Sequence, residues 1–162
     1  MREDLRAKTV CFTGHRRISE PREEVERRVE KVVEELIRQG YLYFGAGGAR
    51  GFDAISSETV LRLKERYPQI HLILVLPFDE QYSRENDWTS ADIEQYRWLK
   101  ARASKIVTIA SSYSPGIYYR RNRHLVDNSS VCVAYMTRRD SGTGYTVSYA
   151  REHSIKIINI AK

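Results

Sequence analysis

The strongest constraint on the fold is the regular alternation of short apolar runs with longer amphipathic runs along the chain. Residues 70–76 are almost continuously apolar, which is typical of a strand that is covered on both faces of a sheet. Between such runs, hydrophobic residues recur at helical spacing, as they do from Val25 to Ile37, and Gly40 is placed to end that helix. Strands that alternate with helices form right-handed βαβ units and build a parallel sheet.

This pattern predicts one α/β domain that spans residues 1–162, with a three-layer Rossmann-like fold. We expect a parallel sheet of about six strands in the common order 3-2-1-4-5-6, with helices on both faces. A long polar loop is expected at residues 77–90. The expected strands are residues 9–12, 41–44, 70–76, 106–109, 131–135 and 155–160, and the expected helices are residues 21–40, 52–66, 92–103, a segment through 121–126, and 142–153.

Composition excludes several other classes of protein. Hydrophobic residues make up 41% of the chain, enough for a core, yet no window approaches the ~18 apolar residues of a membrane span. The charged segment 1–8 lacks an apolar signal core, so we expect a cytoplasmic location. Cys11 and Cys132 are far apart, each inside an apolar run, and we expect buried thiols rather than a disulfide or a metal pair. A zinc site would need more clustered ligands, so no metal is expected.

The charge balance is basic, with a net charge of +6 and a pI of about 9.4. Such an excess suits nucleic acid, and it also suits a small anionic ligand. The chain has no block of consecutive basic residues of the kind found in nucleic-acid-binding tails. The planar fork of arginine favours phosphate contacts, whereas Arg62 has the position of a solvated charge on a helix face.

The expected topology locates a ligand site. In open α/β sheets, ligands bind beyond the carboxyl ends of the strands, where the strand order reverses. With the expected order, the reversal lies between the first and fourth strands. The loops at residues 13–20, 45–51, 110–116 and 136–143 should then surround one crevice.

The second of these loops is rich in glycine and reads GAGGARGFD at residues 45–53. Glycine lets a ligand approach the backbone closely, and a helix that opens directly afterwards directs N–H groups at an anion. The loop is neither a P-loop nor a dinucleotide-binding fingerprint, because Gly-Lys-Ser/Thr is missing and the GxGxxG spacing is only loosely met. A tight turn without a ligand is the alternative. The candidate ligand-binding residues are Gly47, Gly48, Ala49, Arg50, Gly51 and Asp53.

The loop before the last helix repeats this arrangement and adds hydroxyl groups. Its candidate residues are Ser141, Gly142, Thr143 and Thr146. The hydroxyls could donate to a phosphate or a ribose, and they could equally cap the helix.

The first loop and the fourth helix supply further polar groups. Arg16 offers a cation beside the donors of the first loop, although a lone loop histidine is more often a polar surface group. Tyr113, Tyr118 and Tyr119 could stack a base or simply pack at helical spacing. The candidate binding residues of these segments are Thr13, Gly14, His15, Arg16, Arg121 and Asn122.

Two carboxylates at the start of the second helix are candidate catalytic groups. Asp53 and Glu58 follow the glycine-rich loop. A carboxylate at this position stabilises the helix dipole, which accounts for Asp53 without any ligand. The alternative is a hydrogen bond to ribose hydroxyls.

Taken together, the motifs resemble one family. The chain is similar to the YpsA-like branch of the SLOG superfamily, which also contains the LOG phosphoribohydrolases and the DNA-processing protein DprA. The resemblance implies a Rossmann-like fold and a nucleotide-related ligand, of which an ADP-ribose-like molecule is one form. The matching stretches are FTGHR at 12–16, GAGGARGFD at 45–53 with Glu58, ILVLPF at 73–78, RRNRHLVDNSSVCVAY at 120–135 and SGTGYTVSYA at 141–150.

One departure from the LOG enzymes matters. Their Pro-Gly-Gly-x-Gly-Thr-x-Glu motif supplies a glutamate that acts on the N-glycosidic bond. Here no Pro-Gly-Gly precedes Gly142-Thr143, and the segment that follows, with Thr146 and Val147, contains no carboxylate where one would be needed. A threonine does not act unaided as a general base near neutral pH.

The leading expectation is therefore the binding of a small phosphate-bearing molecule, a nucleotide or an ADP-ribose-like derivative, with a sensor role left open. A hydrolase of nucleotide N-glycosidic bonds, using Asp53 or Glu58, is the first alternative. Single-stranded nucleic acid, as for DprA, ranks last because the arginines are dispersed through the helices. No further cofactor is expected, and a homodimer is left open.

Overall fold

The computed structural model describes residues 4–84 and 87–162. Residues 1–3 of the charged N-terminal segment and residues 85–86 of the expected loop 77–90 lie outside the described residues. The described elements, in chain order, are the 3-10 helix η1 (Leu5–Lys8), β1 (Thr9–Gly14), α1 (Arg22–Arg38), β2 (Tyr43–Ala46), α2 (Phe52–Lys64), β3 (His71–Phe78), the 3-10 helix η2 (Gln81–Arg84), α3 (Ser90–Arg102), β4 (Lys105–Ala110), α4 (Ile117–Asp127), β5 (Val131–Tyr135), α5 (Gly142–Glu152) and β6 (Lys156–Asn159).

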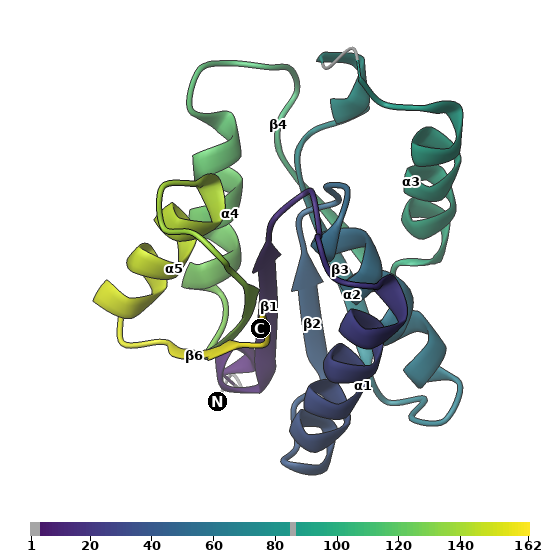
Figure 1. The fold of residues 1–162 in the computed structure, drawn as a ribbon, viewed down its shortest axis with the longest axis vertical. Helices are drawn as coiled ribbons and strands as arrows, with labels where there is room; N and C mark the ends of the chain where they lie inside the picture. Colours follow the sequence, from purple (N-terminus) through teal and green to yellow (C-terminus); the bar gives the residue numbers. More distant parts are fainter. Residues whose placement is uncertain (1–3, 85–86) are drawn as a thin grey trace.

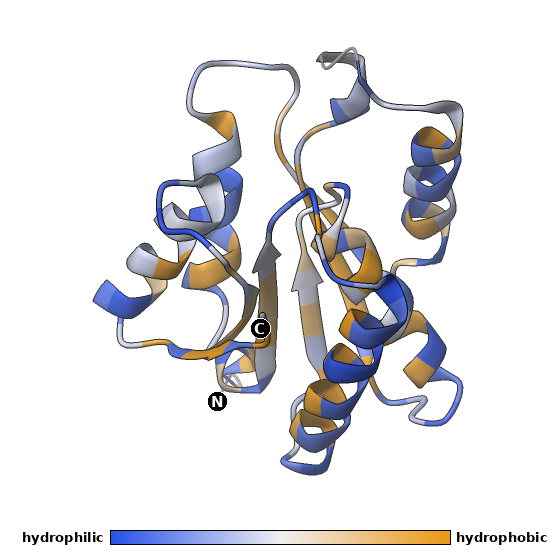
Figure 2. Ribbon diagram, in the orientation of Figure 1, coloured by the Kyte–Doolittle hydropathy of each residue, from blue (hydrophilic) through white to orange (hydrophobic). Residues whose placement is uncertain are grey.

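The sheet is parallel and lies between two layers of helices, which confirms the predicted three-layer α/β class. Helices α1, α2 and α3 cover one face, and α4 and α5 cover the other (Figure 1). The apolar stripes of the helices face the sheet, while their outer faces are hydrophilic (Figure 2). No helix of the described part of the chain is both long and apolar enough to cross a membrane.

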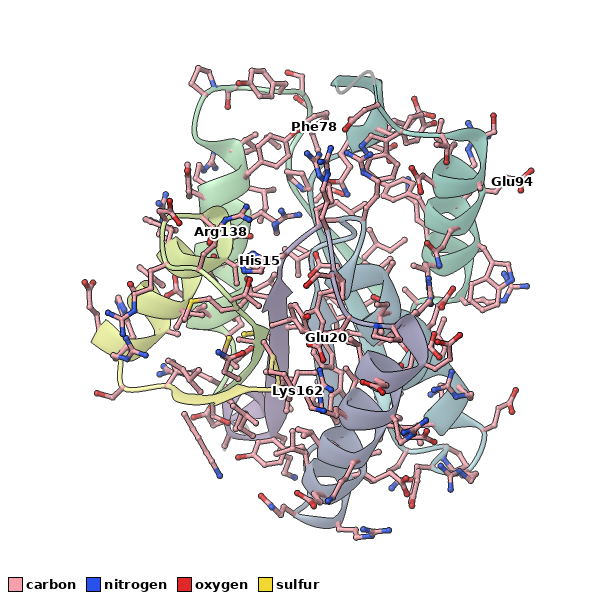
Figure 3. The ribbon with its side chains drawn as sticks, in the orientation of Figure 1. His15, Glu20, Phe78, Glu94, Arg138 and Lys162 are labelled. Atoms are coloured by element: carbon pink, nitrogen blue, oxygen red, sulfur yellow. The ribbon has the colours of Figure 1, made fainter. Side chains whose placement is uncertain are left out.

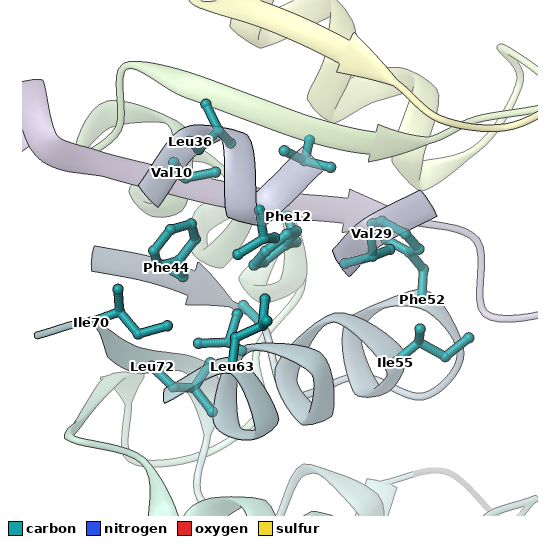
Figure 4. Close-up of a cluster of buried hydrophobic side chains, with 14 of the residues drawn as sticks. Val10, Phe12, Val29, Leu36, Phe44, Phe52, Ile55, Leu63, Ile70 and Leu72 are labelled. Carbon is teal, nitrogen blue, oxygen red and sulfur yellow. The ribbon is translucent and has the colours of Figure 1, made fainter. Parts of the chain in front are cut away.

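The larger core lies under α1, α2 and α3. Phe12 of β1 packs against Phe44 of β2 and Phe52 of α2, with ring centroids 6.3 Å apart in both pairs (Figure 4). Helix α1 contributes its predicted apolar face, from Val25 to Ile37. Gly40 follows that helix with a φ of +99°, a backbone conformation that favours glycine.

The strand order is β4-β3-β2-β1-β5-β6, so the expected order 3-2-1-4-5-6 is wrong in the position of the fourth strand. Strand β4 lies outside β3 at the edge, and β5 takes the place beside β1. Burial explains the difference. Lys105 and Thr108 leave β4 partly exposed, whereas every residue of β5 is buried. A partly polar strand suits an edge, and a wholly apolar strand suits the centre of the sheet.

The observed order moves the topological reversal to the gap between β1 and β5. The loops that follow these two strands therefore flank the crevice, and α4 crosses back over the sheet between β4 and β5, as its contacts with β3, β4 and β1 show. In the same pair of strands, Cys11 lies directly opposite Cys132. Both are buried free thiols, as predicted.

The expected loop 77–90 is shorter than predicted. Strand β3 runs on to Phe78, η2 occupies Gln81–Arg84, and α3 begins at Ser90. Thr89 caps α3, because its side chain accepts a hydrogen bond from the backbone of Asp92 while the Asp92 carboxylate accepts one from Thr89.

Candidate functional site

A cavity of about 390 Å³ opens at the carboxyl ends of the central strands. Residues from the end of β1, from the loops after β1, β2, β3 and β5, and from the helices α2, α4 and α5 line it. The lining residues are Phe12, Thr13, Gly14, His15, Arg16, Ala49, Arg50, Asp53, Gln81, Trp88, Tyr118, Tyr119, Arg121, Asn122, Leu125, Arg138, Ser141, Gly142 and Thr143.

The loop after β1 is tied to the loop after β5 through His15. The backbone N–H of Thr137 donates to Nε2 of His15 over 2.8 Å, and the His15 ring is buried (Figure 3). This acceptor role requires a neutral imidazole with its proton on Nδ1. Burial and the nearby Arg138 guanidinium both lower the pKa of His15, which favours the same neutral form.

This arrangement predicts a pH dependence of stability. Because the folded-state pKa of His15 is lowered from 6.5, its contribution is complete above about pH 6.5 and is lost as the pH falls towards the folded-state pKa. His15→Gln keeps an acceptor at similar reach and does not titrate. We expect urea unfolding between pH 8 and 5 to show a smaller loss of stability in His15→Gln than in the wild type. Parallel profiles of the two proteins would contradict the assignment.

The glycine-rich loop is held from its inner side by polar side chains. The Gln81 amide donates to the carbonyl of Gly48 over 3.0 Å, and the Arg121 guanidinium donates to the carbonyl of Gly47. Gly48 has a φ of +74°, and a Cβ built there would lie 2.6 Å from the Leu76 side chain. These glycines therefore serve close packing. Ala49 and Arg50 line the cavity, whereas Gly47, Gly48 and Gly51 do not.

Asp53 lies beneath this loop and is buried. Its Oδ2 accepts a hydrogen bond of 3.3 Å from the backbone N–H of Ala49. Burial raises the pKa of Asp53, while the charge of Arg121 and backbone hydrogen bonds from Ala49 and Gly47 oppose the rise. The carboxylate thus clamps the loop, in addition to facing the cavity.

Glu58 does not line the cavity. Its carboxylate accepts hydrogen bonds from Arg22 of α1 and Gln95 of α3. The structure therefore brings only one of the two candidate carboxylates to the crevice.

The first turn of α5 presents its backbone to the cavity. Ser141 caps the helix, because its Oγ accepts from the N–H of Gly144 over 2.9 Å. The N–H groups of Gly142 and Thr143, which precede the first intrahelical donor, have no acceptor in the described part of the chain. Thr146 does not line the cavity. It is buried, and its hydroxyl donates a hydrogen bond of 3.1 Å to the carbonyl of Gly142.

Four arginines line the cavity and make it electropositive. Arg50 and Arg16 form ion pairs with Asp87, at 3.0 Å and 3.9 Å respectively. Arg121 is buried, and its Nε donates to Asn122 over 2.8 Å. Arg138, which is exposed, lies beside His15 (Figure 3).

Several lining residues had not been selected from the sequence. Arg138 lies in the loop 136–143, which is expected at the crevice, so its place in the sequence already indicates a lining position. Gln81 and Trp88 follow β3, whose loop was not expected there, and no sequence pattern indicated them. Conversely, Tyr113 and the rest of the expected loop 110–116 do not line the cavity, because β4 is at the edge of the sheet.

Two solved structures of DNA-processing protein A share the fold. The protein from Streptococcus pneumoniae matches with a TM-score of 0.68 at 17% identity, over 94% of this chain and 50% of that one. The Helicobacter pylori protein, described by its single-stranded DNA binding mode, matches with a TM-score of 0.68 at 19% identity, over 94% of this chain and 65% of that one. The chain thus spans half to two thirds of these structures.

The chain covers a larger share of the length of its relatives in sequence. The "Uncharacterized SPbeta prophage-derived protein YoqJ" of Bacillus subtilis is 29% identical over 134 residues, which are 75% of this chain and 77% of that protein. A UPF0398 protein of Bacillus pumilus is 25% identical over 133 residues, which are 80% of this chain and 70% of that protein. The model of the YpsA family, described as "YspA SLOG family", matches residues 15–160. The chain therefore belongs to the YpsA family of SLOG proteins.

Proposed function

We propose that this protein binds a nucleotide or a nucleotide-derived molecule, with an ADP-ribose-like molecule as one form of it, through a phosphate at the N-terminus of α5. The observation that carries the proposal is the pair of N–H groups of Gly142 and Thr143 at the cavity wall. A helix N-terminus carries about half a positive charge and is a ready anion site. The exposed Arg138 and the buried Thr13 line the same cavity as this terminus.

Binding fits the groups present better than hydrolysis does. Asp53 is the only carboxylate among the described lining residues, and it is engaged in holding Ala49. No carboxylate follows Gly142-Thr143 between Tyr145 and Val147, where a glutamate of the LOG type would be needed, and the Thr146 hydroxyl is bound within α5.

The experiment is a thermal-shift screen with AMP, ADP-ribose, NAD and inorganic phosphate, followed by titration calorimetry of each ligand that raises Tm. A ligand that binds only the folded state raises Tm, and the rise grows with the logarithm of the ratio of free ligand concentration to Kd once that ratio is large. We expect phosphate-bearing nucleotides to bind and the corresponding nucleosides not to bind. The absence of any shift with every nucleotide would refute the proposal.

Arg138→Ala tests the cationic side of the site. The loss of one charge-assisted hydrogen bond at an exposed position should weaken AMP binding about tenfold. The wild-type affinity should also fall with added salt more steeply than that of the variant. Arg62→Ala is the matched control, because Arg62 pairs with Glu30 over 3.8 Å and lies outside the cavity. An equal effect of the two substitutions would argue against the assignment.

Single-stranded nucleic acid is the second candidate, supported by the net charge of +6 and by the fold shared with DNA-processing protein A. Oligonucleotide binding should fall steeply with salt. A filter-binding assay at low salt that retains AMP-competable oligonucleotide would favour this candidate.

A further inference from the structure

The aromatic residues of the cavity differ in how much of each ring is covered. Phe12 belongs to the core. The Trp88 ring is covered by the Arg50 guanidinium, 4.8 Å from its centroid, and by Tyr96 at 5.8 Å. The Tyr118 ring packs near Phe78, at 6.2 Å. These three rings are occupied by the protein itself.

Tyr119 is different, because it lines the cavity and is 45% exposed. Its ring meets the Tyr145 ring edge to face, with centroids 4.6 Å apart. Tyr145 is 37% exposed, and its hydroxyl accepts a hydrogen bond of 2.8 Å from Arg123. This bond holds the Tyr145 ring across the gap between α4 and α5, which lie side by side (Figure 1). Tyr119 therefore brings one ring of an exposed aromatic pair to the wall of the cavity.

One member of the pair, Tyr145, is close to the proposed phosphate position along the chain. Tyr145 lies in the first turn of α5, two residues after the second of the donors Gly142 and Thr143. A nucleotide whose phosphate reaches these donors carries its base one sugar away. Tyr119 lines the same cavity as these donors, so its exposed ring is available to that base.

We propose that Tyr119, supported by Tyr145, forms a subsite that stacks the aromatic heterocycle of the ligand. This inference rests on the proposed function and extends it to the ring-bearing end of the ligand. Stacking on a tyrosine tolerates every base, because every base has a π-face. The subsite therefore selects ligands that have a base over sugar phosphates that lack one, with weak preference among the bases.

The test compares AMP with ribose 5-phosphate, by calorimetry, on three variants. Tyr119→Leu keeps apolar bulk and removes the aromatic ring, and Tyr119→Phe keeps the ring. Trp98→Leu is the control, because Trp98 is 43% exposed on α3 and does not line the cavity. Tyr119→Leu should weaken AMP binding on the order of tenfold and leave ribose 5-phosphate unchanged. Tyr119→Phe and Trp98→Leu should match the wild type.

The outcomes separate the two proposals. If Tyr119→Leu leaves AMP affinity unchanged, or weakens both ligands equally, the stacking subsite is refuted while phosphate binding stands. If AMP binds the wild type no more tightly than ribose 5-phosphate does, the subsite is refuted in the same way. If neither ligand binds the wild type, the proposed function fails, and the subsite fails with it.

Discussion

Gly142→Val is expected to abolish nucleotide binding while leaving the fold intact. Gly142 lines the cavity, and a Cβ built there meets nothing within 4 Å. A valine side chain would therefore stand in the open space beside the N–H groups of Gly142 and Thr143. The loss of two charge-assisted hydrogen bonds, each about 1.5–3 kcal/mol, corresponds to a loss of roughly a hundredfold or more in affinity. Calorimetry with AMP measures it.

Stability separates this effect from damage to the protein. Surface substitutions away from special backbone features change stability by about 0.5 kcal/mol or less, and Gly142 is exposed and has no positive φ. Ser148→Val is the matched control, because Ser148 is exposed on the same helix and lies outside the cavity. Both variants should unfold in urea at the wild-type midpoint. Wild-type AMP affinity in Gly142→Val would contradict the phosphate site.

Gly144, two residues further on, would not serve for this experiment. A Cβ at Gly144 would lie 1.8 Å from the carbonyl oxygen of Arg139, which is backbone and has little room to move. Gly51 is similar, with a φ of +75° and the carbonyl oxygen of Arg16 at 2.2 Å. Substitution at either position would displace a loop of the site and confuse unfolding with the loss of ligand contacts.

The helices and strands were predicted well from the sequence, because the spacing of apolar residues follows directly from which side chains are buried. The helix stripe from Val25 to Ile37 and the apolar run of β5 appear in the structure as predicted. Strand order depends on which strands pair, and one signal in the sequence favours the observed order over the common one. Lys105 and Thr108 make β4 the more polar of the two strands, which favours an edge position, and the expected order had placed it in the centre.

Only some of the cavity-lining residues could be predicted from the sequence, and the physical reason differs between the loops. In the first and last loops, Thr13, His15 and Gly142 reach the cavity because the loops after β1 and β5 flank the reversal. In the glycine-rich loop, the glycines indicate that another group lies close to the backbone. The sequence does not show whether that group is a ligand or a side chain of the protein. At Gly48 the neighbours are Leu76 and Gln81 of this chain. Both lie beyond α2 in the sequence, Leu76 in β3 and Gln81 in η2.

Arg121 and Asp53 carry the largest expected effect on stability. Arg121 is buried and donates to the carbonyl of Gly47, and its charge opposes the rise that burial causes in the pKa of Asp53. Without Arg121, the buried Asp53 carboxylate would keep its backbone hydrogen bonds and lose the cation beside it. Breaking a buried charge pair in this way costs about 3–5 kcal/mol. We therefore expect Arg121→Leu to lower the free energy of unfolding by about that amount at neutral pH, a large fraction of the 5–15 kcal/mol typical of a domain. Urea denaturation measures the loss.

The pH dependence identifies the cause of that loss. Without Arg121, burial should raise the folded-state pKa of Asp53 further above its ordinary value of 3.8. A carboxyl group whose pKa is raised by folding contributes full stability below the unfolded-state pKa and loses it as the pH rises through the folded-state pKa. The difference between Arg121→Leu and the wild type should therefore grow from pH 4 to pH 7. Asp53→Asn removes the titrating group and retains an acceptor for Ala49, so the double variant Arg121→Leu/Asp53→Asn should recover part of the lost stability and lose this pH dependence. A single variant whose deficit stays constant with pH would assign the loss to packing around Gly47 instead of to the buried charge.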